Sequence, residues 1–284
     1  MAKSVTVRTF LNMKQAGEKI AMVTAYDYPT AKLLEEAGVH ALLVGDSLGM
    51  VVQGQSTTVP VTLDDILYHT RMVTRAVTRP LVVADMPFLS NQISIETTLR
   101  NAGRLMQEGG AHAVKMEGGA ELADTVHRLV QAGIPVMAHV GLTPQSVHAL
   151  GGFAVQGRKL PEVERMLDAV TALEQSGAFA VVLEAVPAEV AEAITKRLTI
   201  PTIGIGAGAG CDGQVLVFHD MMGYTSGYIP KHNKQYATLA STIVQAAKSY
   251  VQDVATGQFP GPDQTVYLKP AERAELEPLL QPNH

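Results

Sequence analysis

The sequence predicts an α/β protein built as a single (β/α)8 TIM barrel with an extra N-terminal helix. Eight short runs rich in Val, Ile, Leu and Ala recur along its 284 residues. Stretches with helical periodicity separate most of these runs, and this alternation is typical of a parallel sheet that helices cover on both faces. Eight such units in about 250 residues favour a closed barrel over the rival fold, an open doubly wound sheet.

Composition narrows the class of protein. Hydrophobic residues make up 46% of the chain and charged residues 17%, which excludes a disordered chain and allows a large core. The net charge of −5 gives no reason to expect a nucleic acid or an anionic membrane as partner. There is no apolar run of transmembrane length and no secretion signal, so we expect a soluble, cytoplasmic protein. The single cysteine, Cys211, excludes an intrachain disulfide.

The eight apolar runs are the expected strands, because near-continuous apolar sequence indicates burial on both faces of a sheet. In chain order they are Ile20–Ala25, Ala41–Gly45, Leu81–Ala84, Ala113–Met116, Val136–His139, Ala180–Leu183, Thr202–Ile205 and Val215–Phe218.

Helices are expected between these strands and before the first. An extra helix over Val7–Ala16 has Val7, Phe10, Leu11 and Lys14 on one face, and we expect it to cover the barrel floor. Thr62 is the expected N-cap of the helix after the second strand. The connection Gly206–Gln214 is too short and too rich in glycine for a helix. The remaining expected helices are Thr30–Ala37, Ser94–Glu108, Ala120–Gln131, Glu162–Ser176, Ala188–Arg197 and Asn233–Val254.

Residues 1–256 are therefore assigned to the barrel. Residues 257–284 are rich in proline and polar residues, and we expect a C-terminal arm or a partly ordered tail there. Two connections, Gly49–Val61 and Gly141–Pro161, are unusually long and follow the second and fifth strands. Both leave the carboxyl ends of the strands, where barrel enzymes carry their active sites, so both are candidate lids.

Acidic residues stand where three consecutive strands end. Asp46, Asp85 and Glu117 follow or end the second, third and fourth strands, so their side chains should converge at one rim. Three clustered carboxylates repel one another and need a cation or protons. Oxygen ligands without a cluster of Cys or His point to a hard ion, Mg²⁺ first. The alternative is that each acid caps a helix or pairs with an arginine.

Three further side chains stand near the same rim. Lys115 lies two residues before Glu117 and so shares its face; it is either a salt-bridge partner or a cation for an anionic substrate. Neighbouring carboxylates would raise the pKa of Lys115, which argues against imine chemistry. Glu184 ends the sixth strand as either a general base or a structural cap. A lone histidine such as His139 is more often a hydrogen-bonded structural group.

The glycine-rich stretch Gly204–Gly210 is a poor match to a nucleotide-binding loop. It lacks the Lys-Ser/Thr pair of a P-loop, its glycines do not follow the dinucleotide-binding spacing, and no helix is expected after it. Close backbone approach at the barrel rim is the simpler interpretation.

Together these stretches resemble the ketopantoate hydroxymethyltransferase family. The resemblance runs in order over about residues 5–260, and the set of matching motifs is highly specific. The motifs are Leu43–Gly49, Ala84–Phe88, Val114–Gly119, His139–Ser146, Val155–Gly157, Ile203–Gly208 and Cys211–Gln214.

The resemblance implies a Mg²⁺-dependent barrel enzyme of pantothenate and coenzyme A biosynthesis. Such an enzyme transfers a hydroxymethyl group from 5,10-methylenetetrahydrofolate, its co-substrate, to 3-methyl-2-oxobutanoate in an aldol-type reaction through a metal-stabilised enolate. The product is 2-dehydropantoate. The resemblance also implies a cytoplasmic homo-oligomer, typically a decamer.

Residue roles are also implied by the resemblance. Asp46 and Asp85 would bind the metal, and Glu117 would complete the site directly or through water. Glu184 would accept the proton from C3 of the keto acid. The residues implied to contact the keto acid are Asp46, Ser47, Asp85, Lys115 and His139.

Two rival functions remain. One is a metal-dependent lyase or mutase resembling isocitrate lyase or phosphoenolpyruvate mutase. Those lyases use a cysteine in a Lys-Lys-Cys-Gly-His stretch, whereas Cys211 stands in Ala209-Gly210-Cys211-Asp212. The other is a barrel that only senses a keto acid and has no need of Glu184. Tetrahydrofolate-dependent turnover separates the three.

Overall fold

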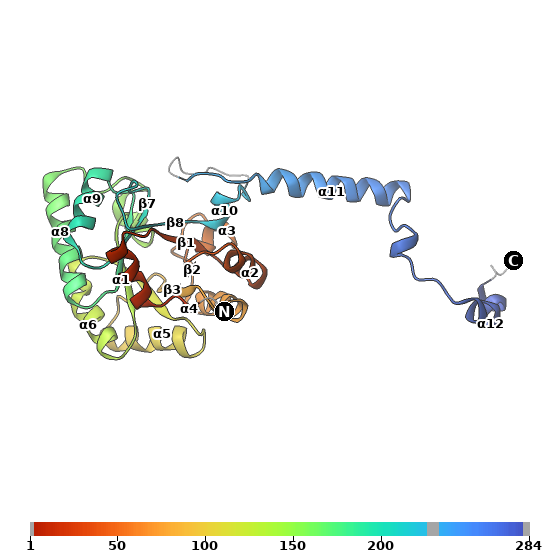
Figure 1. Ribbon diagram of the computed structural model, residues 1–284, viewed down its shortest axis with the longest axis horizontal. Helices are drawn as coiled ribbons and strands as arrows, with labels where there is room; N and C mark the ends of the chain where they lie inside the picture. The colour runs from red at the N-terminus through yellow and green to blue at the C-terminus, as the bar shows by residue number, and fades with distance from the viewer. Residues whose placement is uncertain (1–2, 226–232, 281–284) are drawn as a thin grey trace. The chain divides into compact units, whose positions relative to one another are not determined.

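The computed structural model of the chain, which describes residues 3–225 and 233–280, contains the predicted barrel. Eight parallel strands pair in chain order and β8 closes onto β1 (Figure 1). The closed order excludes the open doubly wound sheet. The strands are β1 Ile20–Thr24, β2 Ala41–Val44, β3 Leu81–Asp85, β4 Ala113–Glu117, β5 Val136–Gly141, β6 Ala180–Glu184, β7 Thr202–Ile205 and β8 Gly213–Leu216.

The last strand begins two residues earlier than predicted. Gly213 pairs with both Ile20 and Ile203, and a Cβ atom at this position would lie 2.5 Å from the backbone oxygen of Ile20. Only glycine allows β8 to approach β1 this closely. Phe218, predicted to end the strand, instead begins helix α10 (Phe218–Met221).

Most helices form where periodicity and capping residues predict them. Thr62 caps α4, accepting a hydrogen bond of 3.1 Å from the backbone N–H of Asp65. Helix α2 begins two residues earlier than predicted, because Asp27 caps it by accepting from Thr30 N at 2.8 Å. No helix forms in Gly206–Gln214, as predicted. The longer helices that precede β8 are α1 Val7–Ala16, α2 Tyr28–Glu36, α4 Leu63–Ala76, α5 Ile95–Gln107, α6 Ala123–Gln131 with a preceding 3-10 turn at Ala120–Leu122, α8 Leu160–Gln175 and α9 Ala188–Arg197.

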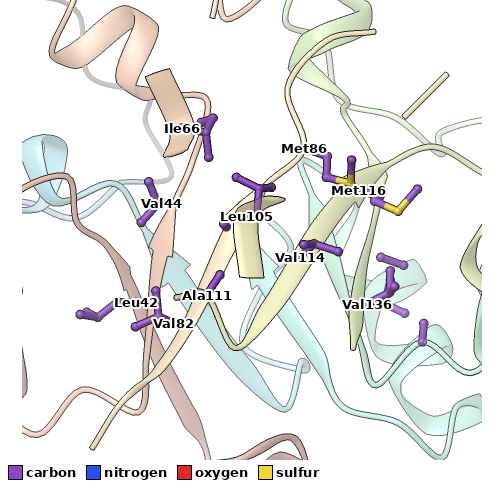
Figure 2. Packing of buried hydrophobic residues seen from close by; sticks show 14 of the residues in the cluster. Leu42, Val44, Ile66, Val82, Met86, Leu105, Ala111, Val114, Met116 and Val136 are labelled. Atoms are coloured by element: carbon purple, nitrogen blue, oxygen red, sulfur yellow. The ribbon is translucent and has the colours of Figure 1, made fainter. Parts of the chain in front are cut away.

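Apolar side chains form two cores, one on each side of the barrel wall. Outward-facing strand residues such as Val82 and Val114 pack against helix residues such as Ile66 and Leu105 (Figure 2). Inward-facing residues form the second core, which helix α1 closes from below with Phe10 and Met13. The floor helix is thus confirmed, although Met13 rather than the predicted Leu11 is the second buried residue of α1.

Both long connections contain short helical turns. Gly49–Val61 overlaps α3 (Leu48–Val51), and Gly141–Pro161 contains a 3-10 turn at Pro144–Ser146 followed by α7 (Val147–Leu150).

The structure divides into two compact units, Met1–Tyr236 and Ala237–His284. The second unit contains α11 (Leu239–Thr256), a 3-10 turn at Pro262–Gln264 and α12 (Pro270–Leu280). Within this unit the rings of Tyr250 and Phe259 meet edge to face at 5.5 Å. In the part of the chain that the structure describes, no helix has both the length and the apolarity that crossing a bilayer requires.

Candidate active site

The three predicted acids lie together at the carboxyl ends of neighbouring strands. Asp85 and Glu117 end β3 and β4, and Asp46 comes two residues after the end of β2. All three side chains are buried, with residue exposures of 4% for Asp46, 1% for Asp85 and 5% for Glu117. Strand alternation turns Lys115 to the same side as Glu117 and sends Met116 into the outer core, as predicted.

A lysine neutralises part of this acid cluster. Lys115 Nζ lies 2.8 Å from Asp85 Oδ1 and 3.8 Å from Glu117 Oε1. The backbone N–H of Asp46 donates to Asp85 Oδ2 at 3.1 Å, which holds the two aspartates side by side. The alternative, in which each acid caps a helix or pairs with an arginine, is therefore not what the structure contains.

Burial and mutual repulsion set the protonation of the cluster. Burial, followed by repulsion from Asp85 and Glu117, raises the pKa of Asp46 well above its usual range. Burial also raises the pKa of Asp85, although Lys115 opposes this shift. Burial alone would lower the pKa of Lys115, but attraction to Asp85, Glu117 and Asp46 outweighs it and raises that pKa. The amine stays protonated, which agrees with the argument against imine chemistry.

His139 occupies the centre of the site, although its sequence context favoured a structural role. Its Nδ1 lies 3.3 Å from Glu117 Oε1 and 3.1 Å from Lys115 Nζ, and its Nε2 lies 3.2 Å from Glu184 Oε2. Burial and Lys115 disfavour the charged ring, but contacts with Glu117 and Glu184 outweigh them and raise the pKa of His139 to about 9. The histidine thus links the acid cluster to Glu184.

Glu184 is the most accessible of these carboxylates. It ends β6, and its side chain is 19% exposed. Gly141 stands opposite it in the register with a φ of +97°, and a Cβ atom there would lie 2.3 Å from Glu184 O. Glycine is therefore required at the end of β5, where the chain turns and Leu142 N donates to Glu184 O at 2.8 Å. This contact fixes the backbone that carries Glu184.

Ser47 meets a tyrosine that sequence analysis did not select. Ser47 Oγ lies 2.7 Å from the hydroxyl of Tyr26, which follows β1 and is 2% exposed. Burial raises the pKa of Tyr26, so its hydroxyl remains a neutral donor. Nothing in the sequence distinguishes Tyr26 from a core aromatic residue.

Gln145 is the second residue that sequence analysis missed. It is buried, and its side chain hydrogen-bonds to Asp46 Oδ2 at 2.8 Å. It belongs to the recognised motif His139–Ser146, which was the one signal that could have drawn attention to it.

The donor chemistry of the cluster fits a hard divalent cation. Four carboxyl groups, those of Asp46, Asp85, Glu117 and Glu184, outnumber the two basic side chains, Lys115 and His139, and carboxylate oxygens are ligands that hard divalent ions prefer. Lys115 lies between Asp85 and Glu117. Among residues 3–225 and 233–280, no three Asp, Glu, His or Cys side chains are arranged to hold a metal ion together. The adjacent pair Asp46 and Asp85 could therefore hold an ion.

A closed parallel barrel with buried acids, a lysine and a histidine at the carboxyl ends of its strands defines a (β/α)8-barrel enzyme. Comparison with known proteins gives the family. Residues 4–262 match the family described as ketopantoate hydroxymethyltransferase, and the chain belongs to this family.

Curated relatives carry one name. The 3-methyl-2-oxobutanoate hydroxymethyltransferase of Carboxydothermus hydrogenoformans is 57% identical over 256 residues, which cover 90% of this chain and 93% of that protein. The protein of the same name from Chloroflexus aurantiacus is 54% identical over 270 residues, which cover 95% of each chain.

Solved structures share the fold at much lower identity. A phosphonopyruvate hydrolase in complex with oxalate and Mg²⁺ has a TM-score of 0.60 and 14% identity, over 96% of this chain and 94% of its own. A 2,3-dimethylmalate lyase, described as a member of the phosphoenolpyruvate mutase/isocitrate lyase superfamily, has a TM-score of 0.59 and 16% identity, over 98% and 96%. At these identities the likeness concerns the fold alone.

The position of Cys211 argues against the rival function of a lyase that uses a catalytic cysteine. Cys211 is fully buried and directly precedes Asp212 and β8, so it lies at the amino ends of the strands. The acid cluster lies at the carboxyl ends. A thiol at the opposite end of the barrel cannot reach a substrate bound at that cluster.

Proposed function

We propose that this protein transfers a hydroxymethyl group from 5,10-methylenetetrahydrofolate to 3-methyl-2-oxobutanoate in pantothenate biosynthesis, with Mg²⁺ as cofactor. The observation that carries the proposal is the buried cluster of Asp46, Asp85, Lys115 and Glu117, joined through His139 to Glu184. The curated names of relatives that are 54–57% identical support the same reaction.

Asp46 and Asp85 would hold the metal ion, and Glu117 would complete the site directly or through water. When bound, Mg²⁺ would supply Lewis acidity to the ketone oxygen of the 2-oxo acid and compensate negative charge there. The ion would also relieve the repulsion that raises the pKa of Asp46.

Lys115 and Ser47 would hold the keto acid. The protonated amine of Lys115 is a fixed positive charge for the substrate carboxylate. The hydroxyl of Ser47 can donate to the substrate while accepting from Tyr26, whose hydroxyl lies 2.7 Å away. Both residues adjoin Asp46 and Asp85, so the substrate and the ion would share one pocket.

Glu184 would accept the proton from C3 of the keto acid. The electron pair of the broken C3–H bond then forms the new bond from C3 to the one-carbon unit of the folate. His139 would orient the Glu184 carboxylate through Nε2, which lies 3.2 Å from Glu184 Oε2. The other ring nitrogen of His139, Nδ1, contacts Glu117. One water supplies the hydroxyl oxygen, and the products are 2-dehydropantoate and tetrahydrofolate.

The same proposal includes the setting of the reaction. We propose that the protein acts in the cytoplasm as a homo-oligomer, a decamer in the pattern of the resembled family, without nucleic-acid or membrane partners. The acidic balance of −5 supports the absence of nucleic acid.

Turnover with a labelled one-carbon donor tests the proposed reaction. We expect the purified protein with Mg²⁺, 3-methyl-2-oxobutanoate and ¹³C-methylenetetrahydrofolate to form labelled 2-dehydropantoate, measured by mass spectrometry. Chelation with EDTA should abolish the product and added Mg²⁺ should restore it. Binding of the keto acid without product would instead favour a sensor, and cleavage of a 2-oxo acid without folate would favour a lyase.

A further inference from the structure

Gln145 joins three segments of the barrel rim. Its side-chain Nε2 donates to Asp46 Oδ2 at 2.8 Å, after β2, and to the backbone oxygen of Met86 at 3.0 Å, after β3. Its backbone N–H donates to Glu117 Oε2 at 3.1 Å, at the end of β4. One residue of the connection after β5 therefore contacts two of the three acids of the cluster.

The orientation of the Gln145 amide follows from its partners. A carboxylate oxygen and a carbonyl oxygen can only accept, so the nitrogen must face both of them. The amide oxygen Oε1 consequently faces away from both of these partners. Gln145 is 4% exposed, and its buried Oε1 has no hydrogen-bond partner among the described residues. A buried acceptor without a donor is costly and indicates a missing partner.

We propose that Gln145 is a positioning residue that couples divalent-ion binding to anchoring of the connection 141–161. This inference rests on the proposed function, since the ion is the one proposed for Asp46 and Asp85. The amide nitrogen fixes the Asp46 carboxylate, and Oε1 accepts a hydrogen bond from a water ligand of the ion. The backbone N–H restrains Glu117, so filling the site also anchors the segment that carries Gln145.

Backbone hydrogen bonds and a buried side chain hold the first residues of the connection 141–161. Leu142 N donates to Glu184 O at 2.8 Å, Ser146 N donates to Thr143 O at 2.9 Å, and Val147 is buried in the barrel. Near its end, Gln156 N donates to Ala185 O at 2.9 Å, and the exposed residues Arg158 and Lys159 that follow offer accessible cleavage sites for trypsin. Anchoring at Gln145 should therefore change the protease sensitivity of the connection.

Calorimetric titration with Mg²⁺ alone tests the proposal. Gln145→Met keeps the approximate size of the side chain and removes its amide, and we expect the dissociation constant for Mg²⁺ to rise by about 10–100-fold. The matched control is Gln156→Met, in the same connection, whose amide donates to Ala154 O at 2.9 Å; it should bind Mg²⁺ as the wild type does. A rise of less than tenfold in a folded Gln145→Met protein would overturn the proposal.

A second measurement needs no variant. We expect Mg²⁺ to slow tryptic cleavage of the wild type at Arg158 and Lys159, while cleavage at Arg273 in α12 stays unchanged. Absence of this protection would overturn the coupling even if Gln145→Met failed to fold. A wild type that does not bind Mg²⁺ at all would contradict the proposed function itself, whereas a variant that binds as well as the wild type contradicts this inference alone.

Discussion

Replacing Glu184 by glutamine is expected to lower the turnover number by about 10²–10⁴-fold, because a positioned general base contributes an effect of this size. The amide keeps the shape of the side chain but cannot accept the C3 proton. Its oxygen can still accept from His139 Nε2, which lies 3.2 Å from Glu184 Oε2, so the neighbouring contacts survive. Steady-state kinetics should show the loss in kcat, while calorimetry shows keto-acid binding close to that of the wild type.

Glu189→Gln is the matched control for this prediction. Glu189 is exposed in the first turn of α9, five residues after Glu184, and the same chemical change there should leave kcat unchanged. Activity within tenfold of the wild type in Glu184→Gln would remove Glu184 from the role of proton acceptor.

Replacing Asp85 by asparagine is expected to lower kcat/KM by about 10³-fold, since the bound ion is expected to supply several kcal/mol of charge stabilisation. Asp85 is 1% exposed and pairs with Lys115 at 2.8 Å, so the neutral amide removes the nearest counter-charge of the lysine beside the ion site. That positive charge should repel the cation. The effect should appear as weaker Mg²⁺ binding in calorimetry and as a higher Mg²⁺ requirement in turnover.

Asp64→Asn provides the control for Asp85→Asn. Asp64 is also an aspartate in an ion pair, 2.8 Å from Arg104, but its side chain is 78% exposed at the surface. Exposed pairs contribute little, so neither Mg²⁺ binding nor turnover should change. Normal Mg²⁺ dependence in Asp85→Asn would exclude Asp85 as a ligand.

The barrel could be predicted because its signal is local and repeated. Each strand is an apolar run that ends in a turn or a polar residue, and the bounds of β7 and of α1 and α9 agree with the prediction. The start of β8 could not be predicted, because it depends on how closely Gly213 approaches Ile20, about 190 residues away in the sequence.

The site residues also divide into those with a local sequence signal and those placed by contacts between distant parts of the chain. Asp46, Asp85 and Glu117 stand out because an acid at the end of a buried apolar run is unusual, and strand order brings such acids together. The contact between Gln145 and Asp46 joins residues 99 positions apart, and nothing in the local sequence around Gln145 predicts this contact. The place of His139 could not be predicted for the same reason, since its contacts are with Glu117 and Glu184 on the two neighbouring strands.

The central claim is that a divalent ion at Asp46 and Asp85 and a base at Glu184 together remove the C3 proton of 3-methyl-2-oxobutanoate. Proton NMR of the keto acid in D₂O with the protein and without folate measures this step directly. We expect loss of the C3 proton signal that requires Mg²⁺ and that is absent with EDTA and in Glu184→Gln. Exchange that continues at the same rate after metal removal, or in Glu184→Gln, would contradict the account.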